Sequence, residues 1–62
     1  MSQTSQEAYQ ENLIKVEQQI RLLVGNLKNH KARQIKDPTN WGYSGDMNFV
    51  LNELTDINNF LY

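Results

Sequence analysis

A stripe of seven positions, spaced alternately four and three residues apart, runs through the first half of this 62-residue chain. Its members, six of them apolar or aromatic, are Tyr9, Leu13, Val16, Ile20, Leu23, Leu27 and His30. This is the spacing of the buried seam of a helix that packs against other helices. Ile14, Leu22 and Val24 lie off the seam, so the apolar face is wider than a two-stranded coiled coil needs. The pattern predicts a long first helix with more than one packing partner.

Local signals predict where this helix starts and ends. The run from Thr4 to Glu7 is a capping box, in which the Thr4 hydroxyl accepts from the Glu7 amide and the Glu7 side chain reaches back to the Thr4 amide. Apolar periodicity fades after Leu27, so the helix either frays near residue 30 or continues to Ile35. It does not pass Asp37, because Pro38 disfavours helical geometry in the residue before it. Gly25, inside the helix, either permits close helix approach or marks a bend.

The segment after the first helix contains two turn signals. Residues 37–40, with the sequence Asp-Pro-Thr-Asn, predict a turn. Residues 41–46 then predict a compact turn, since Gly42 and Gly45 supply backbone conformations that other residues resist. Asp46 is the expected N-cap of the second helix, and Ser44 is the competing assignment.

A second stripe follows this turn at alternating spacings of three and four residues. It comprises Met47, Val50, Leu54, Ile57 and Leu61, and Phe49, Leu51 and Phe60 widen it. Two helices joined by one turn predict a single all-α domain over residues 1–62, an antiparallel helical hairpin. A first helix of about 28 residues is about 42 Å long, and a second of about 15 residues is about 22 Å long.

The short second helix cannot cover the whole stripe on the first. The uncovered part has four members, which are Tyr9, Leu13, Val16 and Ile20. We therefore expect a homo-oligomer, most simply an antiparallel dimer that forms a four-helix bundle with these residues at the subunit interface.

The residues that usually carry catalysis are scarce in this chain. His30 is the only histidine, there is no cysteine, and Ser44 has no neighbour that resembles a catalytic triad. No His/Cys cluster or calcium loop predicts a metal site, and no cofactor is expected. We expect a non-enzymatic protein, with His30 in a packing or capping role. No apolar run approaches the ~20 residues that span a bilayer, and the first residues do not resemble a signal peptide. A cytoplasmic location is expected.

A basic run precedes the turn and leaves two interpretations open. Its members are Lys28, Lys31, Arg33 and Lys36. These cations either form a solvated helix end that complements the helix dipole, or combine with Trp41 and Tyr43 to bind a nucleotide or short phosphodiester. Trp41 has two corresponding interpretations: a plug that closes the end of the hairpin core, or a stacking platform for a base. Asp46 counts against the anion site, because its carboxylate competes for the same backbone amides.

The residues from Asn40 to Met47, followed by the Val50-Leu-Asn-Glu-Leu54 run and the closing Phe60-Leu61, resemble a group of small helical proteins of bacteria, plasmids and phages. These share a Trp-Gly-x-x-Gly-Asp-apolar turn ahead of a C-terminal helix that ends in Phe-Leu. The resemblance implies a helical hairpin and a phage or mobile-element context. It implies no activity that can be assigned to particular residues.

In that context the leading hypothesis is a stoichiometric inhibitor of a host defence protein, with Asp37, Glu53 and Asp56 as candidates for its contact surface. The first alternative is an oligomeric sponge that sequesters a signalling nucleotide through the basic run and the turn. The second is a small DNA-binding regulator that uses residues 28–36. DNA is the least favoured partner, because net charge is −1 and no recognition helix is apparent.

Overall fold

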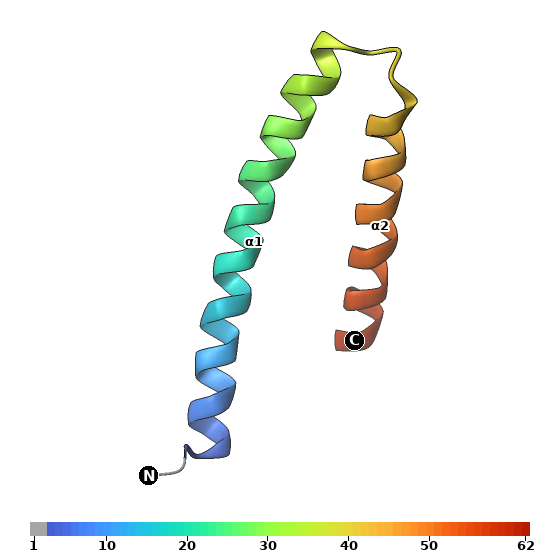
Figure 1. Ribbon diagram of the computed structural model, residues 1–62. Coiled ribbons are helices and arrows are strands. Elements are labelled where there is room, and N and C mark those ends of the chain that lie inside the picture. The colour runs from blue at the N-terminus through green and yellow to red at the C-terminus, as the bar shows by residue number, and fades with distance from the viewer. Residues whose placement is uncertain (1–2) are drawn as a thin grey trace.

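The chain forms two α-helices joined by a short turn. The computed structural model describes residues 3–62, in which α1 comprises Ser5–Lys36 (32 residues) and α2 comprises Trp41–Leu61 (21 residues). Residues 37–40 connect them, as their Asp-Pro-Thr-Asn sequence predicts. The fold is therefore an all-α helical hairpin with a longer first helix (Figure 1). Both helices are longer than the 28 and 15 residues expected from the sequence.

The start of α1 follows the predicted capping box with one change. Thr4 is the N-cap, and its Oγ1 accepts a hydrogen bond of 3.1 Å from the backbone amide of Glu7. The Glu7 carboxylate does not bond to the Thr4 amide as expected; its Oε1 accepts from the Thr4 hydroxyl at 2.9 Å. The acidic side chain still lies in the first turn, where it complements the positive end of the helix dipole.

The end of α1 lies further along the chain than the apolar pattern indicates. The helix continues through residues 30 and 35 to Lys36, with Asp37 as C-cap just before Pro38. The backbone amide of Asp37 donates to the carbonyl oxygen of Gln34 at 3.1 Å, which satisfies one of the last carbonyl groups. Arg33 and Lys36 occupy the last turn, where their positive charges favour the helix C-terminus.

The start of α2 corrects the prediction for residues 41–46. These residues form no turn, because they are the opening of α2 itself, which begins at Trp41. The N-cap is Asn40, so both proposed caps, Asp46 and Ser44, are wrong. The glycines in this segment do not use their conformational freedom, since within residues 3–62 no glycine has a positive φ.

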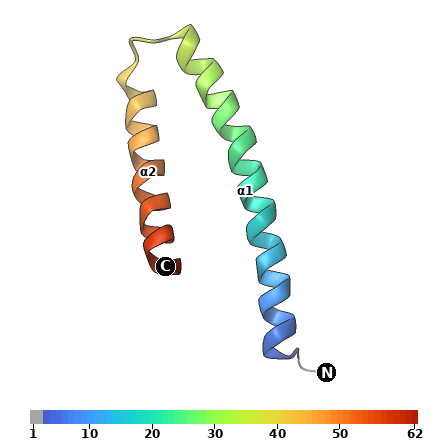
Figure 2. The ribbon, with the colours of Figure 1, turned by 180° about the vertical axis from the view of Figure 1, so that it is seen from behind.

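The two helices approach each other only near the turn. Both views show axes that spread apart with distance from residues 37–40, which gives the chain a V shape (Figures 1 and 2). The chain measures 54 × 22 × 15 Å along its principal axes. The N-terminal part of α1 extends well past the end of α2, because α1 is the longer helix. Gly25 makes no close approach in this hairpin: a Cβ added there would meet nothing within 4 Å.

A buried core is missing from the described part of the chain. None of residues 3–62 is buried, whether apolar or polar. Apart from Ala8 near the start of α1, the half-buried residues gather where the helices meet, and they are Leu23, Leu27, His30, Gln34, Tyr43 and Val50. Neither helix is long and apolar enough over its described residues to cross a membrane.

Candidate functional site

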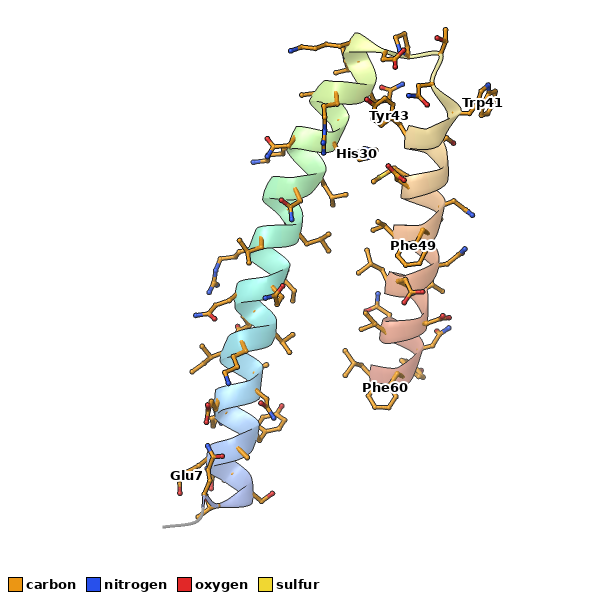
Figure 3. The ribbon with its side chains drawn as sticks, viewed as in Figure 1. Glu7, His30, Trp41, Tyr43, Phe49 and Phe60 are labelled. Carbon is orange, nitrogen blue, oxygen red and sulfur yellow. The ribbon has the colours of Figure 1, made fainter. Side chains whose placement is uncertain are left out.

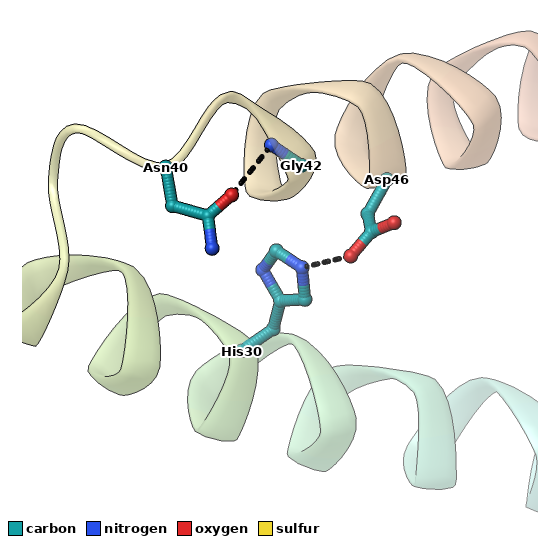
Figure 4. Close-up of polar contacts among 4 residues, drawn as sticks. All are labelled: His30, Asn40, Gly42 and Asp46. Carbon is teal, nitrogen blue, oxygen red and sulfur yellow. Dashed lines mark hydrogen bonds and ion pairs between the residues drawn. The ribbon is translucent and has the colours of Figure 1, made fainter.

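The junction of the two helices is organised by Asn40. Its side-chain oxygen accepts a 2.9 Å hydrogen bond from the backbone amide of Gly42, which caps the start of α2 (Figure 4). Its side-chain nitrogen donates to the Asp37 carboxylate at 3.3 Å, and its backbone amide donates to the Asp37 carbonyl at 3.2 Å. Asn40 thus ties the end of α1 to the beginning of α2 and sets the direction in which α2 leaves the turn.

His30 links the two helices further from the connection, six residues before the end of α1. Its Nε2 lies 3.0 Å from Oδ2 of Asp46 (Figure 4). The Tyr43 ring meets the imidazole edge-on, with ring centroids 5.2 Å apart and planes at 89°. His30 continues the α1 seam, and Tyr43 lies four residues before Met47, so it continues the α2 stripe towards the turn. Asp46, expected to cap α2, instead pairs with α1.

Sequence reasoning missed the roles of Asn40 and of the His30–Asp46 pair. The signal for the first was present, because asparagine ranks with aspartate as an N-cap. The extension of the apolar stripe back to Tyr43 also indicated that α2 starts before residue 46. The His30–Asp46 pair had no local signal, since the two residues are 16 positions apart and meet only when the hairpin closes.

A cleft of about 570 Å³ lies beside this junction. Three residues that the sequence singles out for ligand binding, Lys31, Trp41 and Tyr43, contribute to its lining. Its wall also contains polar groups from His30 and Asn40, and apolar groups that include Leu27, Pro38 and Met47. One cationic residue, two aromatic residues and several residues with hydrogen-bonding groups thus line a single hollow.

The remaining cations of the basic run lie elsewhere. Arg33 lines a second cleft of about 360 Å³, together with Asp46 and Phe49 and without Lys31. Lys28 and Lys36 line neither of these two clefts. At about 100° of rotation per residue, the four cations are spread around α1. This distribution counts against DNA binding, which favours basic side chains clustered on one face.

Trp41 is not a plug for the hairpin core. Its side chain is 86% exposed and points away from α1, whereas Tyr43 points towards α1 (Figure 3). The difference follows from helical geometry, because two residues along a helix are rotated by about 200° and face opposite sides. The plug interpretation of Trp41 is therefore wrong, and the half-buried aromatic residue at the junction is Tyr43.

The residues expected at a subunit interface are uncovered in the single chain. Tyr9 is exposed near the N-terminal end of α1. Leu13, Val16 and Ile20 are 40%, 53% and 54% exposed, although they continue the seam that Leu23 and Leu27 form near the turn. The seam is thus partly covered at one end of α1 and open at the other.

Charge is divided unequally between the two helices. α1 carries all six lysine and arginine residues of the chain, five of them after Ile20, with Glu7, Glu11 and Glu17 before it. α2 carries three acidic residues and no basic one. No group of three potential metal ligands among His, Cys, Asp and Glu occurs within residues 3–62. Comparisons with protein-family models, curated proteins and solved structures found no match to this chain.

Proposed function

We propose that this chain is a non-enzymatic binding protein that works as an assembled helical bundle. The observation that carries this proposal is that none of residues 3–62 is buried in the single chain. Ordering 60 residues costs conformational entropy, and burial of apolar surface is the main term that offsets it. A lone hairpin whose seam is exposed to solvent lacks this burial of apolar surface. Association of identical chains supplies it, most simply as an antiparallel dimer of hairpins in a four-helix bundle.

The expected activity is stoichiometric inhibition of a host defence protein. α2 supports this with a flank of four exposed residues at spacings of four, three and four: Phe49, Glu53, Asp56 and Phe60. We call this the acidic–aromatic flank. Exposed aromatic side chains are typical anchors of protein interfaces, and α2 has no cation to offset the acidic groups. The flank fits a basic, partly apolar surface on a target protein, and the phage context implied by the resemblance makes a defence protein the expected target.

The first measurement is the association state, followed by activity in cells. Sedimentation equilibrium at micromolar concentration is expected to give a dimer, and a folded monomer would overturn the assembly. Bacterial strains that each carry one defence system are then infected with phage while they express the chain. In one strain we expect the phage to form plaques again because the defence system is blocked. We expect the activity of the purified target to fall in proportion to the added chain until a fixed molar ratio is reached.

The acidic–aromatic flank has a matched control on the same helix. Glu53→Lys is expected to abolish the recovery, because it places a cation against a basic partner. Thr55→Lys introduces the same charge on the opposite side of α2 and is expected to retain activity. If phage form plaques equally well with both variants, the flank is not the contact surface. If plaque formation recovers in no strain, a defence protein is not the target.

A second candidate, a sponge for a signalling nucleotide, is favoured by one observation. Lys31, Trp41 and Tyr43 line the same cleft of about 570 Å³. A cation offers charge to a phosphate, and aromatic rings offer faces on which bases stack. Trp41 is exposed enough to stack without rearrangement of the hairpin.

Thermal-shift measurements with cyclic di- and trinucleotides test the sponge. A ligand that binds only the folded protein raises its melting temperature, and Trp41 fluorescence reports the contact directly. Lys31→Ala is expected to remove the shift, whereas Lys28→Ala, which lies outside both clefts, is expected to keep it. An unchanged melting temperature across the nucleotide panel would contradict this candidate.

A further inference from the structure

The seam residues of α1 are spaced almost symmetrically on either side of Ile20. Leu13 lies seven residues before Ile20, and Leu27 lies seven after it. Val16 is four residues before Ile20 and Leu23 three after, while Tyr9 is eleven before and His30 ten after. Consider two such helices that run in opposite directions with the Ile20 residues of the two chains side by side. Each seam residue of one helix then lies opposite a seam residue of the other, to within one position along the chain. The seam is thus complementary to a reversed copy of itself.

Helix lengths favour the same arrangement. At 1.5 Å per residue, α2 accompanies its own α1 from about residue 36 back to about residue 16. A two-fold axis through Ile20 brings the partner's α2 level with residues from about 4 to 24 of the first α1. The part of α1 beyond the end of its own α2, which includes Tyr9 and Leu13, is therefore accompanied by the partner's α2.

The charges of α1 decide its direction relative to the partner. The half before Ile20 contains Glu7, Glu11 and Glu17 with one cation, whereas the half after it contains five cations and no acid. A parallel pair would place the two basic halves side by side, where like charges repel. An antiparallel pair places each basic half beside the partner's acidic half.

We infer that the occupant of the open α1 seam is the α1 helix of a second copy of this chain, antiparallel and centred on Ile20. This inference rests on the assembly in the proposed function and adds its partner, direction and register. One consequence concerns the candidate site. The partner's Tyr9 comes level with His30, so the cleft beside the junction is bounded by residues from both chains of the dimer.

Cysteine crosslinking tests the register, because the chain contains no cysteine of its own. Ile20→Cys is expected to give disulfide-linked dimers at a yield several-fold above that of Gln18→Cys, which lies on the opposite side of α1. A mixture of Leu13→Cys chains and Leu27→Cys chains is expected to crosslink as mixed dimers, while each variant alone stays largely uncrosslinked. Circular dichroism of each variant is the check that its helical content is kept.

The outcomes separate this inference from the assembly on which it rests. Efficient crosslinking of Leu13→Cys alone would show a parallel pair and overturn the inference. So would a sedimenting dimer without crosslinks at any seam cysteine, although the assembly would then survive. A folded monomer would overturn both. Unmodified protein provides a second test: in a mixture of labelled and unlabelled chains, isotope-filtered NMR is expected to show interchain contacts of Leu13 with Leu27 and not of Leu13 with Leu13.

Discussion

The Glu11 carboxylate contacts two neighbouring side chains, one about two helical turns before it and one a turn after it. The side-chain amide of Gln3 donates to its carboxylate, and Nζ of Lys15 lies 3.2 Å from the same group. The Gln3 hydrogen bond, followed by the Lys15 contacts, holds the pKa of Glu11 below its usual value of 4.5. All three residues lie on the surface near the N-terminus of α1, so the contribution to stability is small and screened by solvent.

This lowered pKa predicts an acid-sensitive start of α1. A carboxyl group with a lower pKa in the folded state stabilises that state above the unfolded pKa, near pH 4.5, and loses its contribution as pH falls through the folded value. Helical content measured by circular dichroism is expected to decline below pH 4.5, less steeply in Glu11→Gln. Glu17→Gln is the control, since Glu17 makes no ion pair or side-chain hydrogen bond among residues 3–62. An identical acid response in both variants would contradict the role of Glu11.

The first turns of α2 show why local signals misplaced this helix. Asn40 and Asp46 are both favoured N-caps, and two glycines between them suggested a turn rather than a helix. Two facts select Asn40. Its side chain bonds to the amide of Gly42, while the Asp46 carboxylate faces His30 on α1. A helix that starts at Trp41 also carries Tyr43 to the imidazole ring, whereas a start at residue 46 would leave Tyr43 in a loop.

The two glycines of this segment predict different responses to alanine. A Cβ on Gly45 would meet nothing within 4 Å, so Gly45→Ala is expected to stabilise α2 by about 1 kcal/mol through helix propensity. A Cβ on Gly42 would lie 3.0 Å from Oδ1 of Asn40, the atom that caps α2. Gly42→Ala is therefore expected to gain less or to destabilise, because the cap must move. Thermal denaturation of the two variants gives the comparison, and equal stabilisation would contradict the capping geometry.

In the proposed dimer, stability depends on surfaces that a single chain leaves open. With none of residues 3–62 buried, folding of a lone hairpin has little apolar burial to offset chain entropy. Folding and association are then linked, and the melting temperature is expected to rise with protein concentration. The same linkage makes the seam residues of α1 more important for stability than their exposure in the hairpin suggests.

Two truncations on α1 separate the seam from the surface. Ile20→Ala is expected to lower the free energy of unfolding by about 2–5 kcal/mol per subunit, the usual cost for a buried isoleucine. Leu22→Ala removes a similar volume from a side chain that is comparably exposed in the hairpin but does not lie on the seam. It is expected to change the free energy of unfolding by no more than about 0.5 kcal/mol. Denaturant unfolding at one fixed protein concentration compares them. Similar costs for the two variants would contradict a buried seam.

The two helices, the Thr4 cap and the turn at residues 37–40 follow from the amino-acid sequence, although the full lengths of the helices do not. These features depend on interactions within a few residues or on a simple period, and both are visible along the chain. One of the two interpretations of the basic run also predicts that its cations meet Trp41 and Tyr43. Lys31 does line one cleft with these residues, whereas the other cations are spread around α1.

Only the folded hairpin decided which residue caps α2, where Trp41 points and what Asp46 contacts. Each of these depends on where α2 begins, and the alternatives at Asn40 and Asp46 have nearly equal local preference. The choice between them came from groups 16 positions apart, because His30 and Asp46 come within 3.0 Å of each other only when the chain has turned back on itself.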